Sequence, residues 1–293
     1  MKLSVMFITY NRKDEILRAI KSCLENRIAK MEFVIVDNNS NDGTMAEVKK
    51  LLESSNIDYK YYFSDRNLGV SGGRNKAFSI CSGEYVFCFD DDAIIKTELF
   101  FKKTCDFLDK NKDVAAIAYN IYEPKSGNYL IGQREKGVSI EENPLCLSFV
   151  GAAHTLRREL FSDKIYPEKL FFGAEELYAS HTIWSKGYKV VYVDDMKVDH
   201  LPSSINRTDG KVRDYNFILN QYIVRLLNYP YLLWPILTIL FNLRLVKNKL
   251  LTPKYIKSIR QDLKIRYNKE ERHVLSYRTI AMLVKKFGIK NIF

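Results

Sequence analysis

The sequence predicts an α/β protein built on a single, mostly parallel sheet. Short apolar runs alternate with longer amphipathic segments over the first 120 of the 293 residues, an order typical of parallel strands joined by covering helices. Polar clusters follow the apolar runs one after another, as expected where the carboxyl ends of parallel strands form a binding edge. Hydrophobic residues make up 46% of the chain and charged residues 28%, which is ordinary for a globular protein with a large core.

Five apolar runs rich in Val, Ile, Tyr and Phe are expected to form the strands of the first half. They span residues 3–9, 32–37, 59–64, 85–90 and 114–121. Helical periodicity lies between them, over residues 14–27, 44–55 and 97–111. Thr44, with Glu47 three residues later, matches a capping box at the start of the second helix.

The pattern changes after Tyr122 and becomes helical and basic near the end. A hairpin is expected over residues 123–137, a strand leading into a helix over 145–161, a helix over 175–188 and a strand over 189–195. The chain turns helical from about Arg213, with a boundary near 205–215. We therefore expect one domain over residues 1–210, subdivided at residue 120, and a helical extension over residues 211–293.

Cysteine usage and the first residues predict an intracellular protein. The five cysteines are scattered and form no C-x-x-C pair, which favours reduced core residues over a disulfide framework or a zinc site. The first apolar run is only six residues long, too short for a signal peptide. We expect a cytoplasmic location.

Three consecutive aspartates, Asp90 to Asp92, follow the apolar run YVFCF at a predicted strand end. Ionising three adjacent carboxyl groups costs free energy unless a cation or several donors compensate. A solvated acidic turn is the simple alternative. Polar clusters at residues 9–12, 37–40 and 65–67 follow three other predicted strands, so all four clusters are expected at one edge of the sheet. Together they predict a binding site there.

Several motifs resemble one enzyme family. FITYNR, VIVDNNSNDGT, RNLGVSGGRNKAF and FDDDA, in this order and spacing, are similar to the nucleotide-binding half of inverting family 2 glycosyltransferases with the GT-A fold, of the bacterial cell-surface polysaccharide type. The later FFGAEELYASHTIWSKGYKVVYVDDMKVDH resembles the acceptor-side segment of the same family. The resemblance covers residues 1–205 and implies nucleotide-sugar binding by residues 1–120 and an acceptor side in residues 121–210.

The resemblance implies a divalent metal at the aspartates. Asp90-x-Asp92 matches the family's D-x-D motif, with Asp92 as the direct metal ligand and Asp90 nearer the ribose and sugar. His200 stands where several members of the fold complete the metal shell, although a structural histidine is an equal alternative. Carboxylate oxygens suit Mn²⁺ or Mg²⁺, and such a cation neutralises a departing diphosphate.

The donor-side residues are also implied by position in the family. Thr9, Asn11 and Arg12 would line the nucleotide pocket, and Asp37 would accept hydrogen bonds from the base or ribose. The simple alternatives are a surface charge for Arg12 and a helix or turn cap for Asp37. The glycine-rich GVSGGRNKAF enters a helix and can offer backbone donors to phosphate, with Arg74 as a phosphate or sugar contact or, alternatively, a solvated helix residue. The full donor-side set is Thr9, Asn11, Arg12, Asp37, Asn67, Arg74, Asp90 and Asp91.

Glycosyl transfer needs a base for the acceptor hydroxyl, which the family carries on a Glu-Asp pair. Here the pair is Glu175-Glu176, so Glu176 is the candidate base by position. The acid expected two residues later is absent, since Leu177-Tyr178 follows, and Glu175 remains a rival. Acids in the first turn of a helix also stabilise it without any catalytic role.

The end of the chain carries the whole net charge of +11, with 14 Lys and Arg against 3 Asp and Glu from Arg244 onward. The apolar run at residues 229–241 is 13 residues long, whereas a transmembrane helix needs about 20. Apolar anchors beside basic residues predict peripheral contact with anionic lipid at the inner face of the cell membrane. Packing on the catalytic domain or on a second subunit is the equal alternative. No nucleic-acid-binding module is recognised.

The sequence therefore predicts a metal-dependent, inverting glycosyltransferase acting in polysaccharide or cell-wall biosynthesis. Its donor would be a nucleotide diphosphate sugar, a UDP-sugar first and dTDP-rhamnose second, and its acceptor a glycan or lipid-linked saccharide. A sugar-nucleotide nucleotidyltransferase is the first alternative, but TYNRKDE lacks the glycine-rich loop that it would need. A non-catalytic membrane-surface protein on the same fold is the second.

Overall fold

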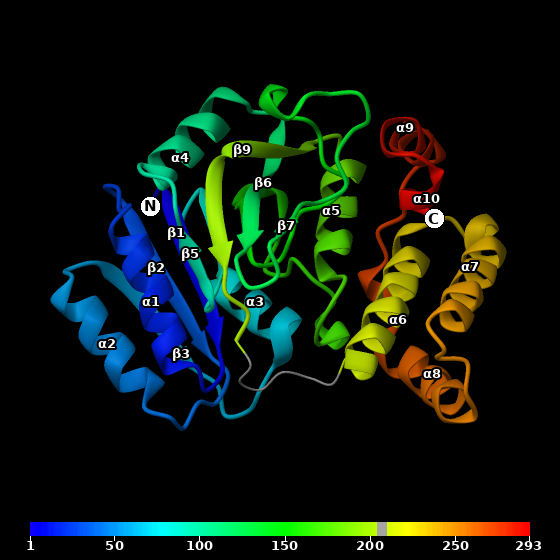
Figure 1. Cartoon of the computed structure of the whole chain (residues 1–293), viewed down its shortest axis with the longest axis horizontal. Coiled ribbons are helices and arrows are strands. Elements are labelled where there is room, and N and C mark those ends of the chain that lie inside the picture. Colours follow the sequence, from blue (N-terminus) through cyan, green and yellow to red (C-terminus); the bar gives the residue numbers. More distant parts are fainter. Residues whose placement is uncertain (204–209) are drawn as a thin grey trace.

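A nine-stranded sheet forms the centre of the computed structural model, which describes residues 1–203 and 210–293 (Figure 1). Its strands are β1 (Leu3–Thr9), β2 (Met31–Asp37), β3 (Asp58–Phe63), β4 (Tyr85–Asp90), β5 (Ala93–Ile95), β6 (Val114–Glu123), β7 (Asn128–Leu130), β8 (Ala153–Arg157) and β9 (Lys189–His200). They lie in the order β3-β2-β1-β4-β8-β6-β9-β5, with β7 paired to β6.

Ten α-helices of the described residues surround this sheet. They are α1 (Lys13–Leu24), α2 (Thr44–Ser54), α3 (Gly69–Ile80), α4 (Phe100–Lys110), α5 (Glu175–Ser185), α6 (Gly210–Asn228), α7 (Trp234–Lys247), α8 (Pro253–Arg266), α9 (Tyr277–Phe287) and α10 (Ile289–Ile292). The helices α6, α7 and α8 gather beyond α5, on the side of the molecule away from α1 and α2 (Figure 1).

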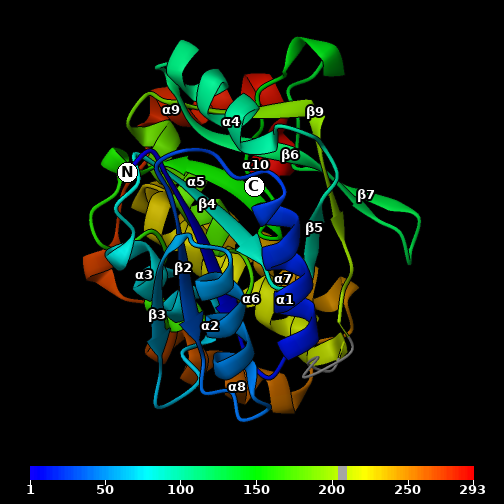
Figure 2. The same ribbon diagram turned by 90° about the vertical axis from the view of Figure 1, so that its left-hand side faces the viewer.

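The expected parallel sheet is confirmed in the first half and becomes mixed in the second. Strands β3, β2, β1 and β4 all pair in parallel, whereas β8 pairs antiparallel with both β4 and β6. Antiparallel pairing needs no crossover helix, and only β7 and a short 3₁₀ turn lie between β6 and β8. The expected hairpin is the β6–β7 pair, which projects from the body of the molecule (Figure 2).

Two local expectations were wrong. Thr44 is the first helical residue of α2 rather than its cap, because Gly43 takes the capping position in a left-handed conformation and the Thr44 hydroxyl donates to Asp42. The helix expected after β8 shrinks to a 3₁₀ turn at Arg158–Leu160. The chain then extends at Phe161, whose ring packs edge-on against Phe78, so tertiary packing overrides the local helical pattern.

Alternating residues of the strands fill a hydrophobic core on each face of the sheet. Phe7, Phe33 and Phe87 belong to the core covered by α1, α2 and α4. Met6 and Val86 belong to the opposite core, which α3, α5 and α9 cover. All five cysteines are buried and free, as expected, and Trp184 is a core residue.

The C-terminal helices pack on the part of the chain that contains the sheet. On α9, Ile280, Leu283 and Phe287 enter the same core as Trp184 of α5, and Arg225 of α6 donates to the backbone carbonyl of Ile292. The expected domain boundary near residues 205–215 lies partly outside the described residues, since β9 ends at His200 and α6 begins at Gly210. Within the described ranges, every helix is too short or too polar to cross a bilayer.

Phe287→Ala tests whether this extension is part of the folded unit. Phe287 is fully buried and its ring lies 5.9 Å from the Trp184 ring, so the truncation should lower the free energy of unfolding by about 3–5 kcal/mol. Urea denaturation measures this loss. The exposed Ile289 supplies the control Ile289→Ala, which should change little. Equal stability of Phe287→Ala and wild type would show that the extension does not stabilise the part of the chain that contains the sheet.

Candidate active site

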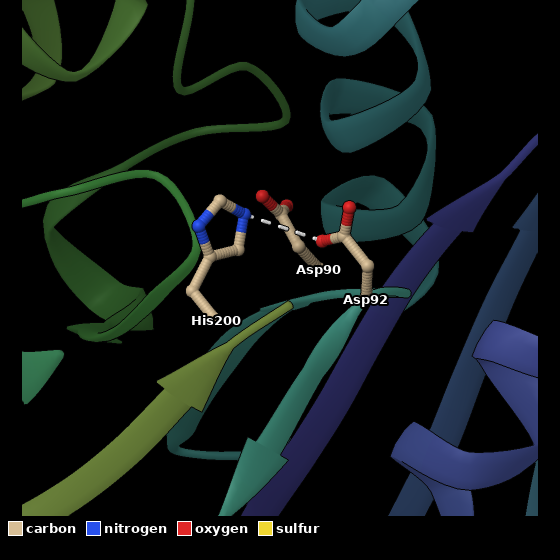
Figure 3. Close-up of side chains that lie close together, drawn as sticks. All are labelled: Asp90, Asp92 and His200. Atoms are coloured by element: carbon tan, nitrogen blue, oxygen red, sulfur yellow. Dashed lines mark ion pairs between the residues drawn. The ribbon is translucent and has the colours of Figure 1, made fainter. Parts of the chain in front are cut away.

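Asp90, Asp92 and His200 form a cluster at the carboxyl end of β4 (Figure 3). Strand β5 pairs antiparallel with β9, with Ala93 opposite His200, and this pairing brings the histidine to the aspartates. One ligand atom from each side chain lies within 4.8 Å of the other two. His200 Nε2 is 3.4 Å from Asp92 Oδ1. The D-x-D motif and the histidine, far apart in sequence, therefore converge.

The chemistry of this donor set fits a divalent metal. Two carboxylates and one imidazole are suitable ligands for Mn²⁺ or Mg²⁺. Burial alone would raise the pKa of Asp92, but the hydrogen bond and charge of His200 lower it below the ordinary value. Asp92 is therefore held as an ionised carboxylate. The same contact raises the pKa of His200 against the opposing effect of burial.

Asp91 points inward between the two ligands of the D-x-D motif. Its carboxylate accepts hydrogen bonds from the Thr9 hydroxyl at 2.8 Å and from Arg12 Nη1 at 2.9 Å. Burial raises the pKa of Asp91 to about 7, although Arg12 opposes the shift. Arg12 also lies 3.3 Å from Asp92. Asp91 thus holds the loop after β1 against the cluster of Asp90, Asp92 and His200.

Arg74 is the central cation of the site. Its side chain is buried, and its Nη2 lies 2.7 Å from Asp90 Oδ1 and 2.9 Å from the Gly151 carbonyl oxygen. Its Nη1 lies 3.4 Å from both Glu175 Oε1 and Glu176 Oε1. The predicted phosphate or sugar contact is therefore already paired with the carboxyl groups of three acidic residues. Arg74 connects the D-x-D motif to the acidic pair.

The two glutamates at the start of α5 differ in exposure. The Glu175 side chain is 2% exposed, and its Oε2 has no hydrogen-bond partner among residues 1–203 and 210–293, whereas the Glu176 side chain is 18% exposed. Burial, followed by the charge of Glu176, raises the pKa of Glu175 to about 8. Burial also raises the pKa of Glu176, with Arg74 opposing. At neutral pH, Glu175 is therefore mainly protonated, and Glu176 is the more accessible carboxylate.

Gly151 permits the close approach of these groups. A Cβ at this position would collide with Glu176 Oε1 and lie 3.2 Å from both terminal nitrogens of Arg74. A side chain at residue 151 would therefore force the ends of the Glu176 and Arg74 side chains to move.

One cleft of about 420 Å³ contains most of the predicted site. The predicted residues that line it are Thr9, Arg12, Asn67, Arg74, Asp90, Asp91, Asp92, Glu175, Glu176 and His200. The D-x-D cluster and the acidic pair thus face the same space, which is the arrangement that transfer between a donor and an acceptor requires.

Two predicted donor contacts do not reach the cleft wall. Asp37 is fully buried, and its carboxylate accepts hydrogen bonds from the Tyr61 hydroxyl at 2.6 Å and the Ser40 backbone N–H at 2.7 Å. Asn11 adopts a left-handed backbone conformation, and its side chain accepts from the Asn41 backbone N–H. Both residues shape the loops after β1 and β2, and Asn38 takes the lining position beside them.

The glycine-rich segment does not present a free helix N-terminus to phosphate. The glycines lie within α3, and the Phe171 carbonyl oxygen accepts from the Val70 and Ser71 backbone N–H groups at 2.7 and 3.4 Å. Gly69 is required there, because a Cβ would lie 2.5 Å from the Phe171 ring. Phe171 itself has φ 60° and ψ −54°. The first turn of α3 and the segment before α5 therefore meet at this contact.

Sequence reasoning missed three further residues of the site. Phe171 and Phe172 are exposed at the cleft and line it; two adjacent aromatics just before the Glu-Glu pair were the available signal. Glu123 Oε1 lies 3.5 Å from His200 Nδ1, where it can orient the imidazole toward the aspartates. Glu123 ends β6, and nothing in the local sequence distinguishes it.

A parallel half-sheet with a D-x-D cluster at its carboxyl edge, facing an acidic pair, defines the class of GT-A glycosyltransferases. The sequence model of glycosyl transferase family 2 matches residues 4–163, more than half of the chain. The chain belongs to this family. The family, the fold and the enzyme class predicted from the motifs are therefore confirmed.

Named relatives and solved structures agree with this assignment. The GalNAc(5)-diNAcBac-PP-undecaprenol beta-1,3-glucosyltransferase of Campylobacter jejuni is 29% identical over 199 residues, which cover 64% of this chain and 60% of that enzyme. S. aureus TarS in complex with UDP matches with a TM-score of 0.58 at 22% identity, covering 77% of this chain and 66% of that chain. For these two proteins, the match spans less than two thirds of their own length.

A third neighbour is the mannosyltransferase PcManGT of Pyrobaculum calidifontis, solved in complex with GDP-Man and Mn²⁺. It matches with a TM-score of 0.60 at 18% identity, covering 97% of this chain and 78% of that chain. At such identities the two structural matches establish the fold.

Glu175→Gln tests the protonation of the buried glutamate. The folded protein keeps the Glu175 proton up to about pH 8, whereas an ordinary glutamate loses it near 4.5. The folded state therefore binds the extra proton in this window, and the free energy of unfolding should fall as pH rises through it. Urea denaturation of wild type and variant between pH 4.5 and 8.5 measures the difference in slope.

The variant cannot titrate at this position, so its stability should decline less steeply with pH than that of wild type. The exposed Glu168, exchanged for Gln, is the matched control and should keep the wild-type slope. Parallel curves for wild type and Glu175→Gln would contradict a raised pKa.

Proposed function

We propose that this protein is a metal-dependent glycosyltransferase that transfers a sugar, with inversion, from a nucleotide diphosphate donor to a carbohydrate hydroxyl. One observation carries the proposal: the Asp90, Asp92 and His200 cluster and the Glu175-Glu176 pair line the same cleft. The metal cluster and the acidic pair serve opposite sides of one reaction centre. A non-catalytic protein on the same fold would have no need to keep both.

The donor half would hold the nucleotide diphosphate. Asp90, Asp92 and His200 would hold Mn²⁺ or Mg²⁺, which supplies Lewis-acid neutralisation of the departing diphosphate. Arg12 and Asn67 line the donor side of the cleft and are the proposed nucleotide contacts. Arg74 is placed between Asp90 and the acidic pair, so its guanidinium would fix the donor-side carboxylate relative to the base.

The acceptor half would supply the base. Glu176, as the more exposed member of the pair, would accept the proton of the attacking acceptor hydroxyl. Attack from this side, opposite the departing diphosphate, inverts the anomeric centre. Glu175 would remain protonated beside it, because its pKa is raised to about 8, and so would add no second charge at neutral pH. The exposed rings of Phe171 and Phe172 would contact the acceptor sugar.

The donor and acceptor are proposed from the relatives. UDP is present in the TarS complex, so a UDP-sugar is our first choice of donor. The second choice is dTDP-rhamnose. The Campylobacter jejuni relative is named for an undecaprenol diphosphate-linked saccharide, so a lipid-linked saccharide is the proposed acceptor, in polysaccharide or cell-wall biosynthesis. The protein would then work in the cytoplasm, in peripheral contact with the inner face of the membrane.

Glu176→Gln tests the assignment of the base. The amide cannot accept a proton, so the turnover rate should fall roughly 10²–10⁴-fold while UDP still binds. The rate of wild type should rise with pH as Glu176 ionises, above the ordinary glutamate range because its pKa is raised. The variant should lack this rise. Single-turnover assays with UDP-sugars across pH measure both effects.

Glu175→Gln is the matched comparison, because the two glutamates are adjacent and contact the same arginine. It should retain most of the turnover at neutral pH, where Glu175 is already protonated. A complete loss in Glu175→Gln with normal turnover in Glu176→Gln would transfer the role of base to Glu175.

A further inference from the structure

Helix α7 is apolar on two opposite faces. Leu237, Phe241 and Leu245 are buried against the body of the protein. Ile236, Ile239, Leu243 and Val246 are 47%, 59%, 59% and 56% exposed. Their spacing of three, four and three residues places them on one side of the helix, opposite the buried residues. We name these four residues the α7 apolar face.

A helix that is hydrophobic all round is normally covered on all sides. In the described structure, α7 stands at the outer edge of the molecule, beyond α6 (Figure 1), so the α7 apolar face is turned away from the core. The preceding turn adds Leu232, which is 79% exposed. A continuous row of large aliphatic side chains in water indicates an interaction surface.

Basic residues accompany this face. Lys247 is the last residue of α7 and Lys249 lies two residues beyond it, and both are exposed. The next helix, α8, adds the exposed Lys257, Arg260 and Lys264. From residue 244 onward the chain carries 14 Lys and Arg against 3 Asp and Glu. The partner of the α7 apolar face should therefore combine an apolar interior with negative charge.

We propose that the α7 apolar face inserts into the interfacial region of an anionic lipid bilayer. A second copy of this chain would be the other apolar partner, but it would bring the same basic residues and repel. Helix α7 has 14 residues, or about 21 Å at 1.5 Å per residue, so it would lie in the plane of the interface. That the membrane also carries a lipid-linked acceptor for the enzyme rests on the proposed function. The binding of α7 to lipid does not depend on that function.

The structure also separates α7 from the other apolar segments of the extension. On α9, Ile280, Leu283 and Phe287 are buried in the core and are therefore not lipid anchors. On α8, Ile256 and Ile265 are 43% and 50% exposed among the basic residues. These two can support α7 at the membrane surface, but they form no continuous row.

Vesicle co-sedimentation of the full chain tests the proposal. Wild type should bind vesicles of phosphatidylcholine with phosphatidylglycerol, and salt should weaken the binding. Ile239→Ser combined with Leu243→Ser should lower the partition coefficient by about tenfold or more, because two aliphatic side chains no longer enter the lipid. Both positions are exposed, so the melting temperature should be preserved.

Two matched controls come from α2, at the far end of the molecule. Met45→Ser removes an exposed apolar side chain and should leave vesicle binding unchanged.

The role of charge is tested on α8. Lys257→Gln combined with Arg260→Gln should weaken binding to the anionic vesicles, whereas the control Lys50→Gln on α2 should not. UDP binding without vesicles should be the same in all of these variants, so failure of the proposed function would be seen separately.

Three results would overturn the proposal. Binding to phosphatidylcholine alone as strong as to the anionic vesicles would remove the role of negative charge. Unchanged vesicle binding of the double variant Ile239→Ser and Leu243→Ser would show that the α7 apolar face does not enter the lipid. Absence of vesicle binding, together with a dimer in analytical ultracentrifugation that this variant loses, would assign the α7 apolar face to a second copy of the chain.

Discussion

The candidate site depends on the ion pairs that one buried side chain, the guanidinium of Arg74, makes with its neighbours. Arg74 comes from α3 in the first half of the chain and pairs with Asp90 at the end of β4 and with both glutamates at the start of α5. Four charged or titratable groups in one buried cluster are tolerable only while they compensate one another, since removing one partner of a buried pair costs about 3–5 kcal/mol. Arg74 therefore fixes the position of Asp90 relative to the Glu175-Glu176 pair.

The C-terminal extension holds the segment that carries Phe171, Phe172 and the Glu175-Glu176 pair. Asn220 of α6 donates to the backbone carbonyls of Leu170, Phe172 and Gly173, and the Phe171 carbonyl in turn accepts from the first turn of α3. The Tyr178 hydroxyl of α5 donates to the carbonyl of Glu271. The extension thus positions the loop and helix that carry Phe171, Phe172 and the acidic pair, while α7 keeps one apolar face outward.

The local sequence was sufficient to predict the site residues that stand at the ends of strands. The apolar runs predicted β1 to β4, and parallel pairing then placed Thr9, Asp90 and Asp92 at one edge. The local sequence was insufficient where a residue far away in the chain determines the contacts of a side chain or of a helix end. Asp37 is buried because Tyr61 binds its carboxylate, and the N-terminus of α3 is occupied by the carbonyl of Phe171. Apolar periodicity likewise could not show that α9 is covered and that one face of α7 is not.

Calorimetric titration of UDP, with and without Mn²⁺, tests the central claim most directly. The claim is that Asp90, Asp92 and His200 form a metal-diphosphate site. The account predicts UDP binding that depends on Mn²⁺ in wild type and is lost in Asp92→Asn, with the fold of the variant preserved. UDP binding of equal strength without Mn²⁺, or unchanged in Asp92→Asn, would contradict the account and leave the aspartates as a turn at the end of β4.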